Sequence, residues 1–286
     1  MNSHAIFGEK NVAWSEARIV VLPVPYDLSL SFRPGARLGP ETIIQASAEL
    51  EPYLFELGVS PEDYGIYVAP AVPWVAGDAA ASHAAIEAAA HYHLAAGKWV
   101  LTLGGDHSVS YPLIRAHQNS ELAVLQLDAH GDLYPGYQNS IYSHAAPMYR
   151  LIQDGFRLVQ VGQRVLSRAE QDLIRAKEIP FFSARAIHQH FDPDRIVATL
   201  PDQVYITLDL DVLDPSQMPS VGTPLPGGLS YLQIMAILSA VFAARQVVGM
   251  DIVEFSPSGE FHAAMTAAQI AYEAMGLLGK ARGWPV

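Results

Sequence analysis

Short apolar segments rich in β-branched residues recur along the chain, and this pattern predicts strands. Most of these segments are continuously apolar rather than alternating, which is typical of a parallel sheet that is covered on both faces. The expected strands are Arg18–Pro25, Ile66–Ala69, Trp99–Leu103, Ala123–Leu127, Leu158–Val161, Pro180–Phe182, Val204–Asp211 and Val247–Phe255.

Helical patterns lie between these segments. The Ala-rich stretch Asp78–Ala96 ends before Gly97, a common position for a helix-terminating glycine. Three further segments have the spacing of a capping box, namely Ser167-x-x-Glu170, Ser230-x-x-Gln233 and Thr266-x-x-Gln269. Alternating strands and helices predict an α/β fold, a three-layer α/β/α sandwich with a mainly parallel central sheet of about eight strands. With no repeat, linker or charge run to divide it, we expect residues 1–286 to form a single domain.

Composition narrows the classes of function. Half of the residues are hydrophobic and 16% are charged, which excludes a largely disordered chain. The formal charge of -12 argues against nucleic acid or an anionic membrane as a partner. Because there is no cysteine, disulfides, thiolate zinc sites and cysteine nucleophiles are excluded, and any metal must be bound by His, Asp or Glu.

The N-terminal sequence and the longest apolar stretches indicate where in the cell the protein is expected. The segment MNSHAIFGEK has neither the basic nor the apolar part of a signal peptide. The longest apolar stretches, around Ala79–Ala96 and Tyr231–Ala244, are interrupted by polar residues or are too short to cross a bilayer. We therefore expect a cytoplasmic protein without a membrane span.

Acidic residues and histidines gather where three of the predicted strands end. Because parallel strands present their carboxyl ends at one edge of a sheet, we expect these residues to converge on one cleft. Side chains alternate along a strand, so Asp128 and His130 should project to one side, as should Asp209 and Asp211. The three clusters are Gly104-Gly105-Asp106-His107-Ser108, Asp128-Ala129-His130-Gly131-Asp132 and Thr207-Leu208-Asp209-Leu210-Asp211.

These clusters predict a site for two metal ions. Burying Asp128, Asp132, Asp209 and Asp211 together requires positive charge, and two divalent cations balance four carboxylates. An oxygen-rich set with two imidazoles, from His107 and His130, suits manganese better than a structural zinc site, although zinc, iron and cobalt also fit these ligand types. A metal pair can lower the pKa of a shared water and supply hydroxide at neutral pH.

The ordered clusters resemble the metal signatures of the ureohydrolase (arginase/agmatinase) family, most of all those of agmatinases. The likeness extends from about Ile19 to Leu278 and includes Val24-Pro25-Tyr26-Asp27, Arg33-Pro34-Gly35 and Gly222-Thr223-Pro224. It implies an arginase-like fold and a homo-oligomer, either a trimer or a hexamer. It also implies two Mn²⁺ per subunit, one bound by His107, Asp128, Asp132 and Asp209 and the other by Asp128, His130, Asp209 and Asp211.

The same resemblance implies catalytic roles for two further residues. Glu254, in Asp251-Ile252-Val253-Glu254-Phe255, matches the glutamate that binds the guanidinium group of the substrate. His144 matches the histidine that shuttles a proton to the departing amine, a role suited to a group that titrates near neutral pH. Asp106 and Asp214 are expected to be hydrogen-bond partners rather than ligands.

The resemblance favours agmatine as the small guanidinium substrate, hydrolysed to putrescine and urea in polyamine biosynthesis. Ser143-His144 followed by Pro147 is similar to agmatinases, and Leu133-Tyr134-Pro135-Gly136-Tyr137 replaces the polar sequence with which arginases bind an α-carboxylate. The chain departs from the agmatinase pattern at Ala145-Ala146 (usually Gly-Thr), at Ser220 (usually Gly) and at Leu28-Ser29-Leu30 (usually a Gly-containing turn).

Three alternatives remain open from the sequence. A guanidinobutyrase or arginase would need a basic rim for the substrate carboxylate, for which Arg150 or Arg164 is a candidate. A non-catalytic metal-binding member of the family would not need Glu254 beside the ligands. A metal deacylase of related fold would need neither Glu254 nor two bridging carboxylates.

Overall fold

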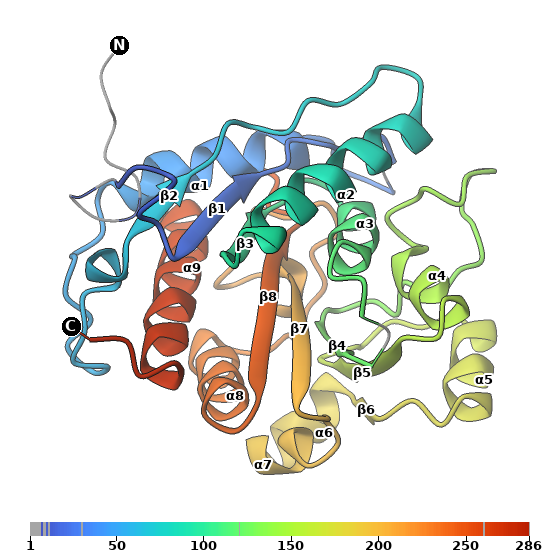
Figure 1. Ribbon diagram of the computed structural model, residues 1–286. Helices are drawn as coiled ribbons and strands as arrows, with labels where there is room; N and C mark the ends of the chain where they lie inside the picture. The colour runs from blue at the N-terminus through green and yellow to red at the C-terminus, as the bar shows by residue number, and fades with distance from the viewer. Residues whose placement is uncertain are drawn as a thin grey trace.

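The predicted strands form one eight-stranded sheet in the computed structural model, in the order β2-β1-β3-β8-β7-β4-β5-β6 (Figure 1). Every neighbouring pair of strands is parallel, which confirms the predicted sheet. The strands are β1 (Ile19–Pro23), β2 (Ile66–Val68), β3 (Trp99–Leu103), β4 (Ala123–Leu127), β5 (Arg157–Val161), β6 (Phe181–Phe182), β7 (Gln203–Asp209) and β8 (Gln246–Val253).

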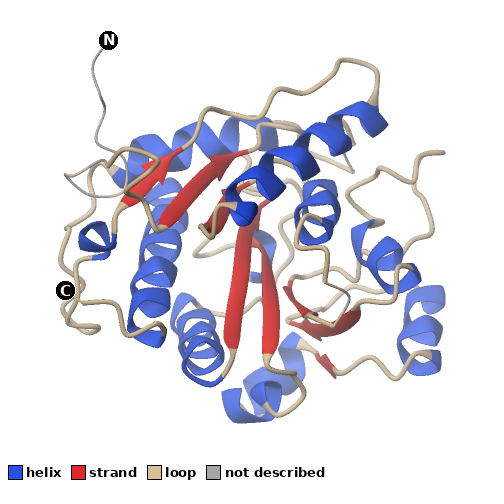
Figure 2. Ribbon diagram, viewed as in Figure 1, coloured by secondary structure: helices blue, strands red, loops and turns tan. Residues whose placement is uncertain are grey.

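Helices cover both faces of this sheet, as Figure 2 shows, and this confirms the three-layer arrangement. On one face lie α1 (Gly39–Ser47), α6 (Ala184–Gln189), α7 (Pro193–Val197), α8 (Tyr231–Ala244) and α9 (Phe261–Ala281). On the other lie α2 (Ala79–Ala95), α3 (Ser110–Arg115), α4 (Pro147–Gln153) and α5 (Arg168–Ala176). Four short 3₁₀ helices complete the described elements: η1 (Ala36–Leu38), η2 (Pro61–Tyr64), η3 (His107–Val109) and η4 (Leu210–Val212).

The continuous apolar runs follow from burial on two sides. In β1, Ile19 and Val21 belong to the core beneath α1 and α9, whereas Val20 and Leu22 belong to the core beneath α2 and α3. Successive side chains point to opposite faces of a strand, so a strand between two helical layers needs an apolar residue at every position.

Two of the three predicted capping boxes are present. Ser167 and Ser230 begin α5 and α8 with reciprocal side-chain and backbone hydrogen bonds. The prediction at Thr266 is wrong, because α9 begins at Phe261 and Thr266 lies within it. There its hydroxyl donates to the carbonyl oxygen of His262 at 3.0 Å. A threonine hydroxyl can bond to the preceding turn inside a helix, so spacing alone did not distinguish the two positions.

The structure describes residue 7, residue 10 and residues 12–29, 31–119, 121–259 and 261–285. The opening segment, whose sequence does not resemble a signal peptide, lies almost wholly outside the described residues. Within the described part, no helix is both long enough and apolar enough to span a membrane.

Helix α9 packs so closely against η2 that one glycine has no space for a side chain. A Cβ at Gly279 would overlap the ring of Tyr64, which is buried and packs edge-on against Trp284 with ring centroids 5.5 Å apart. At Gly276, one turn earlier, a Cβ would meet the terminal methyl groups of Leu54 and Leu57, at 2.9 and 3.1 Å.

We predict that Gly279→Ala destabilises the fold although alanine favours a helix by about 1 kcal/mol. Overpacking against a buried ring costs about 1–3 kcal/mol, and here it acts on a ring that has little freedom to move. The matched variant Gly276→Ala should change the free energy of unfolding by less than about 1 kcal/mol. Urea denaturation of both variants tests this, and equal stabilities would show that the packing at Tyr64 is looser than described.

Candidate metal centre

The four central strands of the sheet, β3, β8, β7 and β4, end at the same edge and supply every predicted site residue except His144. His107 follows β3, Asp128 follows β4, and Asp209 is the last residue of β7. Glu254 comes directly after β8. Carboxyl ends of parallel strands are the usual ligand-binding edge of such a sheet, and the three clusters do converge there.

The predicted reason for the pairing of side chains is wrong. Strand β4 ends at Leu127, so Asp128 and His130 lie in the turn after it, and Asp211 lies in η4 beyond the end of β7. The chain turns because each aspartate accepts a hydrogen bond from a backbone N–H two residues ahead. Asp128 Oδ1 accepts from the N–H of His130 at 2.6 Å, and Asp209 Oδ1 accepts from that of Asp211 at 2.8 Å.

The six predicted ligands nevertheless form one cluster. Nδ1 of His107 lies 3.1 Å from Asp128 Oδ2, 2.9 Å from Asp132 Oδ2 and 3.3 Å from Asp209 Oδ2. Nδ1 of His130 lies 2.9 Å from Asp211 Oδ2 and 3.6 Å from Asp128 Oδ1. Asp128 therefore contacts both histidines. Two triads among the described residues bring their ligand atoms within 4.8 Å of one another: His107, Asp128 and Asp209, and Asp128, His130 and Asp211.

The protonation of His107 shows that a cation fits this cluster. The hydroxyl of Thr207 donates to Asp251 at 2.7 Å, so towards His107 Nε2, 2.9 Å away, it can only accept. Nε2 therefore carries a proton. Against the effect of burial, the three carboxylates around Nδ1 raise the pKa of His107 well above its usual value, because a neutral ring would present its Nδ1 lone pair to them. Buried Nδ1 has no hydrogen-bond partner. A metal ion among these four donors removes that repulsion, and the oxygen and imidazole donors suit a divalent cation.

The pKa values of the aspartates also show that negative charge is concentrated in this cluster. Burial and the neighbouring charges of Asp211 and Asp128 raise the pKa of Asp209 well above its usual value. Burial and the charge of Asp128 raise the pKa of Asp132 to about 7. Burial would also raise the pKa of Asp128, but the neighbouring imidazoles of His107 and His130, in their protonated form, outweigh it and lower that pKa. Cations between these side chains would favour the ionised form of Asp132 and Asp209, whose pKa values are raised.

Glu254 is fixed beside this cluster in a strained backbone conformation. Its φ angle of 65° is unusual for a residue other than glycine, and such strain often occurs at functional sites. Its N–H donates to the carbonyl oxygen of Gly105 at 2.8 Å, and its Oε1 accepts from the N–H of His107 at 2.8 Å. Oε2 faces Gly222, where a Cβ would lie only 3.4 Å away. Gly222 thus leaves space in front of a carboxylate with a set orientation.

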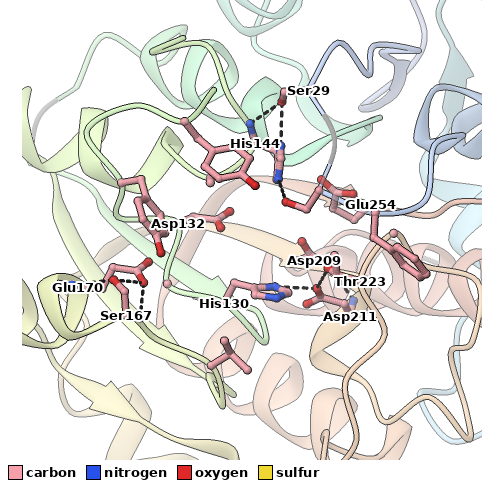
Figure 3. Close-up of a pocket in the computed structure, with 18 of the residues that line it drawn as sticks. Ser29, His130, Asp132, His144, Ser167, Glu170, Asp209, Asp211, Thr223 and Glu254 are labelled. Carbon is pink, nitrogen blue, oxygen red and sulfur yellow. Dashed lines mark hydrogen bonds and ion pairs between the residues drawn. The ribbon is translucent and has the colours of Figure 1, made fainter. Parts of the chain in front are cut away.

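A cavity of about 230 Å³ opens above the cluster. Figure 3 shows Glu254 on one side of this pocket, Glu170 on the opposite side, and His144 above the acidic residues. The pocket is lined by Ser29, Ser31, Phe32, Arg33, His130, Gly131, Asp132, Tyr134, Tyr137, His144, Ala145, Val165, Ser167, Glu170, Asp209, Asp211, Gly222, Thr223 and Glu254.

His144 reaches this pocket from the loop between β4 and α4. Its Nε2 lies 2.8 Å from the hydroxyl of Ser31, and its Nδ1 lies 2.9 Å from the hydroxyl of Ser29. Burial, together with the positive charges of His107 and His130, lowers the pKa of His144 to about 4. The ring is therefore neutral near pH 7 and can accept a proton at one nitrogen.

Sequence reasoning did not identify several residues that line the pocket or contact the acidic cluster. The Leu28-Ser29-Leu30 segment differs from the agmatinase pattern, but no local pattern links Ser29 or Ser31 to His144, which is more than 110 positions away. Glu170 was predicted only as part of a capping box, yet it also lines the pocket. Thr207 had a weak signal, as a polar residue within an apolar strand. Asp106 and Asp214 accept backbone N–H groups, as expected of residues that organise loops.

The two arginines considered for a basic rim do not line the pocket. The guanidinium of Arg164 donates to the carbonyl oxygens of Asp211, at 2.6 Å, and Leu225, at 2.8 Å. The guanidinium of Arg150 stacks on the ring of Tyr111, 3.5 Å from its centroid. Among the described residues that line the pocket, Arg33 is the sole arginine or lysine, and its side chain is exposed.

Comparison with known proteins agrees with this geometry. The N(1)-aminopropylagmatine ureohydrolase of Thermus thermophilus is 58% identical over 282 residues, which cover 98% of this chain and 96% of that protein. The agmatinase of Chromobacterium violaceum is 35% identical and aligns over 91% of this chain and 83% of its own length. The crystal structure of the agmatine ureohydrolase of Thermoplasma volcanium matches with a TM-score of 0.88 at 26% identity, over 96% of this chain and 94% of that one.

A model of the arginase family matches residues 17–276. The matched region contains all the acidic and histidine residues that converge at the sheet edge, as well as His144 and Glu254. The chain therefore belongs to the arginase family.

Proposed function

We propose that the protein is a two-manganese hydrolase that releases urea from an amino-terminated guanidine, either agmatine or its N(1)-aminopropyl derivative. In this proposal His107, Asp128, Asp132 and Asp209 bind one Mn²⁺, and Asp128, His130, Asp209 and Asp211 bind the other. Asp128 and Asp209 serve both ions. The contacts of Asp128 with both histidines and the position of Asp209 between two carboxylates support this assignment.

The observation that carries the proposal is the carboxylate of Glu254 beside the acidic cluster. Oε1 is held by the N–H of His107, and Oε2 faces the open space in front of Gly222. A planar guanidinium pairs best with a carboxylate whose orientation is already set. A cationic substrate bound there would place its central carbon next to the cluster, which a structural metal site would not require.

When bound, the two cations lower the pKa of a water molecule to near neutrality and stabilise the negative charge that develops during attack. Side chains of the protein bind the substrate and transfer the proton. Glu254 binds the guanidinium and orients its carbon. His144, neutral near pH 7, accepts a proton at Nε2 and delivers it to the amine nitrogen as the carbon–nitrogen bond breaks. Water and the guanidinium are thereby converted to urea and an alkylammonium.

The far side of the pocket favours a substrate that ends in an amine. Glu170 lies there with its Oε2 accepting from the N–H and hydroxyl of Ser167, at 2.7 and 2.8 Å. The aromatic rings of Tyr134 and Tyr137 line the pocket nearby and can contact an ammonium group through their faces. An acidic and aromatic wall attracts a cation and disfavours a second carboxylate.

This wall weakens the alternatives of guanidinobutyrate and arginine. Both carry a carboxylate, which would need a cationic partner in the pocket. Among the described residues that line the pocket, Arg33 is the one arginine or lysine. The N(1)-aminopropyl derivative, which would yield spermidine, is favoured over agmatine because the Thermus thermophilus relative with that printed activity is 58% identical. Agmatine would yield putrescine.

We predict urea release from N(1)-aminopropylagmatine and agmatine, with the larger kcat/KM for the aminopropyl compound. Arginine and 4-guanidinobutyrate should react at least about a hundredfold more slowly, because each places a carboxylate against an acidic wall. Colorimetric urea assays with added Mn²⁺ test all four. Metal-loaded protein that is inactive on every guanidine would favour the non-catalytic alternative instead.

We predict that Asp128→Asn reduces kcat by about 10²–10³-fold or more, since loss of a single stabilising group in an active site already has that effect. The loss should accompany weaker Mn²⁺ binding, because Asp128 contacts both histidines of the cluster. Asp172→Asn, a matched change at an exposed position on α5, should retain the activity of the parent protein. Near-normal turnover by Asp128→Asn with full metal occupancy would contradict the two-metal assignment.

We also predict that Mn²⁺ stabilises the fold. A ligand at 100 times its Kd contributes about 2.7 kcal/mol per site, and for a chain of this size each kcal/mol raises Tm by about 2–4 °C. Thermal unfolding should therefore shift upward by at least about 5 °C with Mn²⁺ and return to its starting value with a chelator. No shift with Mn²⁺, Zn²⁺ or Co²⁺ would mean that the cluster does not bind these ions.

A further inference from the structure

We propose that Ser29 is a positioning residue for His144: its hydroxyl, held by Asp106, fixes the imidazole as the tautomer with its proton on Nδ1. Nε2 is then the ring nitrogen that can accept a proton in the pocket. The inference deepens the proposed function and rests on His144 as its proton-transfer group. Figure 3 shows Ser29 and His144 joined on the side of the ring away from the acidic cluster.

Asp106 determines the direction of the Ser29 hydroxyl. Asp106 is buried beside Gly105, where the carbonyl oxygen of Tyr26 leaves no space for a side chain. Its Oδ1 accepts from the N–H and hydroxyl of Ser108, at 3.0 and 2.5 Å. Its Oδ2 accepts from the N–H and hydroxyl of Ser29, at 3.2 and 3.3 Å. The single hydroxyl proton of Ser29 is thus directed to Asp106.

The same oxygen of Ser29 can therefore only accept from His144. It accepts from the backbone N–H of His144 at 2.8 Å and lies 2.9 Å from Nδ1. An unprotonated Nδ1 would place a ring lone pair against a hydroxyl lone pair, so Nδ1 carries the proton. In the neutral ring Nε2 is then the acceptor, and the hydroxyl of Ser31, 2.8 Å away, donates to it.

The other contacts of the ring do not choose between tautomers. The ring of Tyr137 packs edge-on against His144 with centroids 5.6 Å apart. The charges of His107, His130 and Asp128 act on His144 through space and not through hydrogen bonds. Ser29 is therefore the contact that distinguishes Nδ1 from Nε2, and it lies in the turn where the chain departs from the agmatinase sequence pattern.

This assignment has a kinetic consequence. Without the bond to Ser29, the ring can rotate or place its proton on Nε2, which then cannot accept another. In serine-protease triads, loss of the tautomer-fixing partner costs about 10⁴-fold in kcat. The partner here is a neutral hydroxyl, so we expect a smaller loss of about 10–10²-fold. Substrate binding through Glu254 should be unaffected.

The test compares three variants with the parent protein in the presence of Mn²⁺. Ser29→Ala should lower kcat by about 10–10²-fold and change KM by less than about twofold. Ser29→Thr retains a hydroxyl and should recover most of the loss. Ser140→Ala is the matched control, because Ser140 accepts a backbone N–H, from Tyr142 at 3.1 Å, in the loop that carries His144. This control should behave like the parent.

A spectroscopic readout tests the tautomer directly. Nitrogen-15 NMR of histidine-labelled protein, loaded with diamagnetic Zn²⁺ and assigned with His144→Gln, should show protonated Nδ1 and unprotonated Nε2 for His144. Ser29→Ala should move this pattern towards a mixture or towards Nε2–H. An Nε2–H tautomer in the parent, or an unchanged tautomer and kcat in Ser29→Ala, would overturn the proposal.

The two proposals fail in different ways. Suppose that no guanidine is hydrolysed, but that His144 carries its proton on Nδ1 in the parent and shifts towards a mixture or towards Nε2–H in Ser29→Ala. The positioning role then stands and the proposed reaction is wrong. If urea is released at an equal rate by the parent and by a well-folded Ser29→Ala, the reaction stands and the positioning role is wrong. The parent spectrum decides the tautomer even if Ser29→Ala does not fold.

Discussion

The concentration of negative charge at one buried edge of the sheet is the constraint on which the rest of this structure depends. Apolar residues of similar volume are often at least as stabilising as buried charges, because transferring charges from water costs several kcal/mol for each group. The acidic edge is thus not explained by the stability of the fold. Seven carboxyl groups meet there: Asp106, Asp128, Asp132, Asp209, Asp211, Asp251 and Glu254.

These carboxylates fall into two groups, according to their hydrogen-bond partners. Asp106 and Asp251 are surrounded by hydroxyl and N–H donors, so the protein itself satisfies them. Asp106 orients Ser29, and Asp251 orients Thr207. The aspartates of the candidate metal site face one another and two imidazoles, so protein donors satisfy them only in part. The division separates residues that hold side chains in place from those suited to hold cations.

Much of the fold could be predicted because its cause is local. A strand buried on both faces needs apolar residues throughout, and that requirement is visible in single segments such as Ala123–Leu127. The position of the site could also be predicted, because acidic residues and histidines followed the strands. The order of strands could not, since it depends on pairing between distant segments. The alternation argument for Asp209 and Asp211 failed because η4 replaces the expected last residues of the strand.

The residues around His144 were beyond sequence reasoning for a similar reason. Ser29 resembles any loop serine until the fold places it against a residue 115 positions away. Glu170 had a complete local explanation as a capping residue, which concealed its second position at the pocket. Roles that arise from a single long-range contact leave little trace in local patterns.

The strand order has a consequence for how the chain assembles. β3 and β4 are close in sequence, yet β7 and β8 lie between them in the sheet. Until residues 203–253 have left the ribosome, the halves of the sheet retain open edges where the central strands belong. Insertion of the last pair closes the sheet and creates the acidic edge at the same moment. The candidate cation site is thus complete only after synthesis has passed the final strand, and such long-range closure makes folding slow.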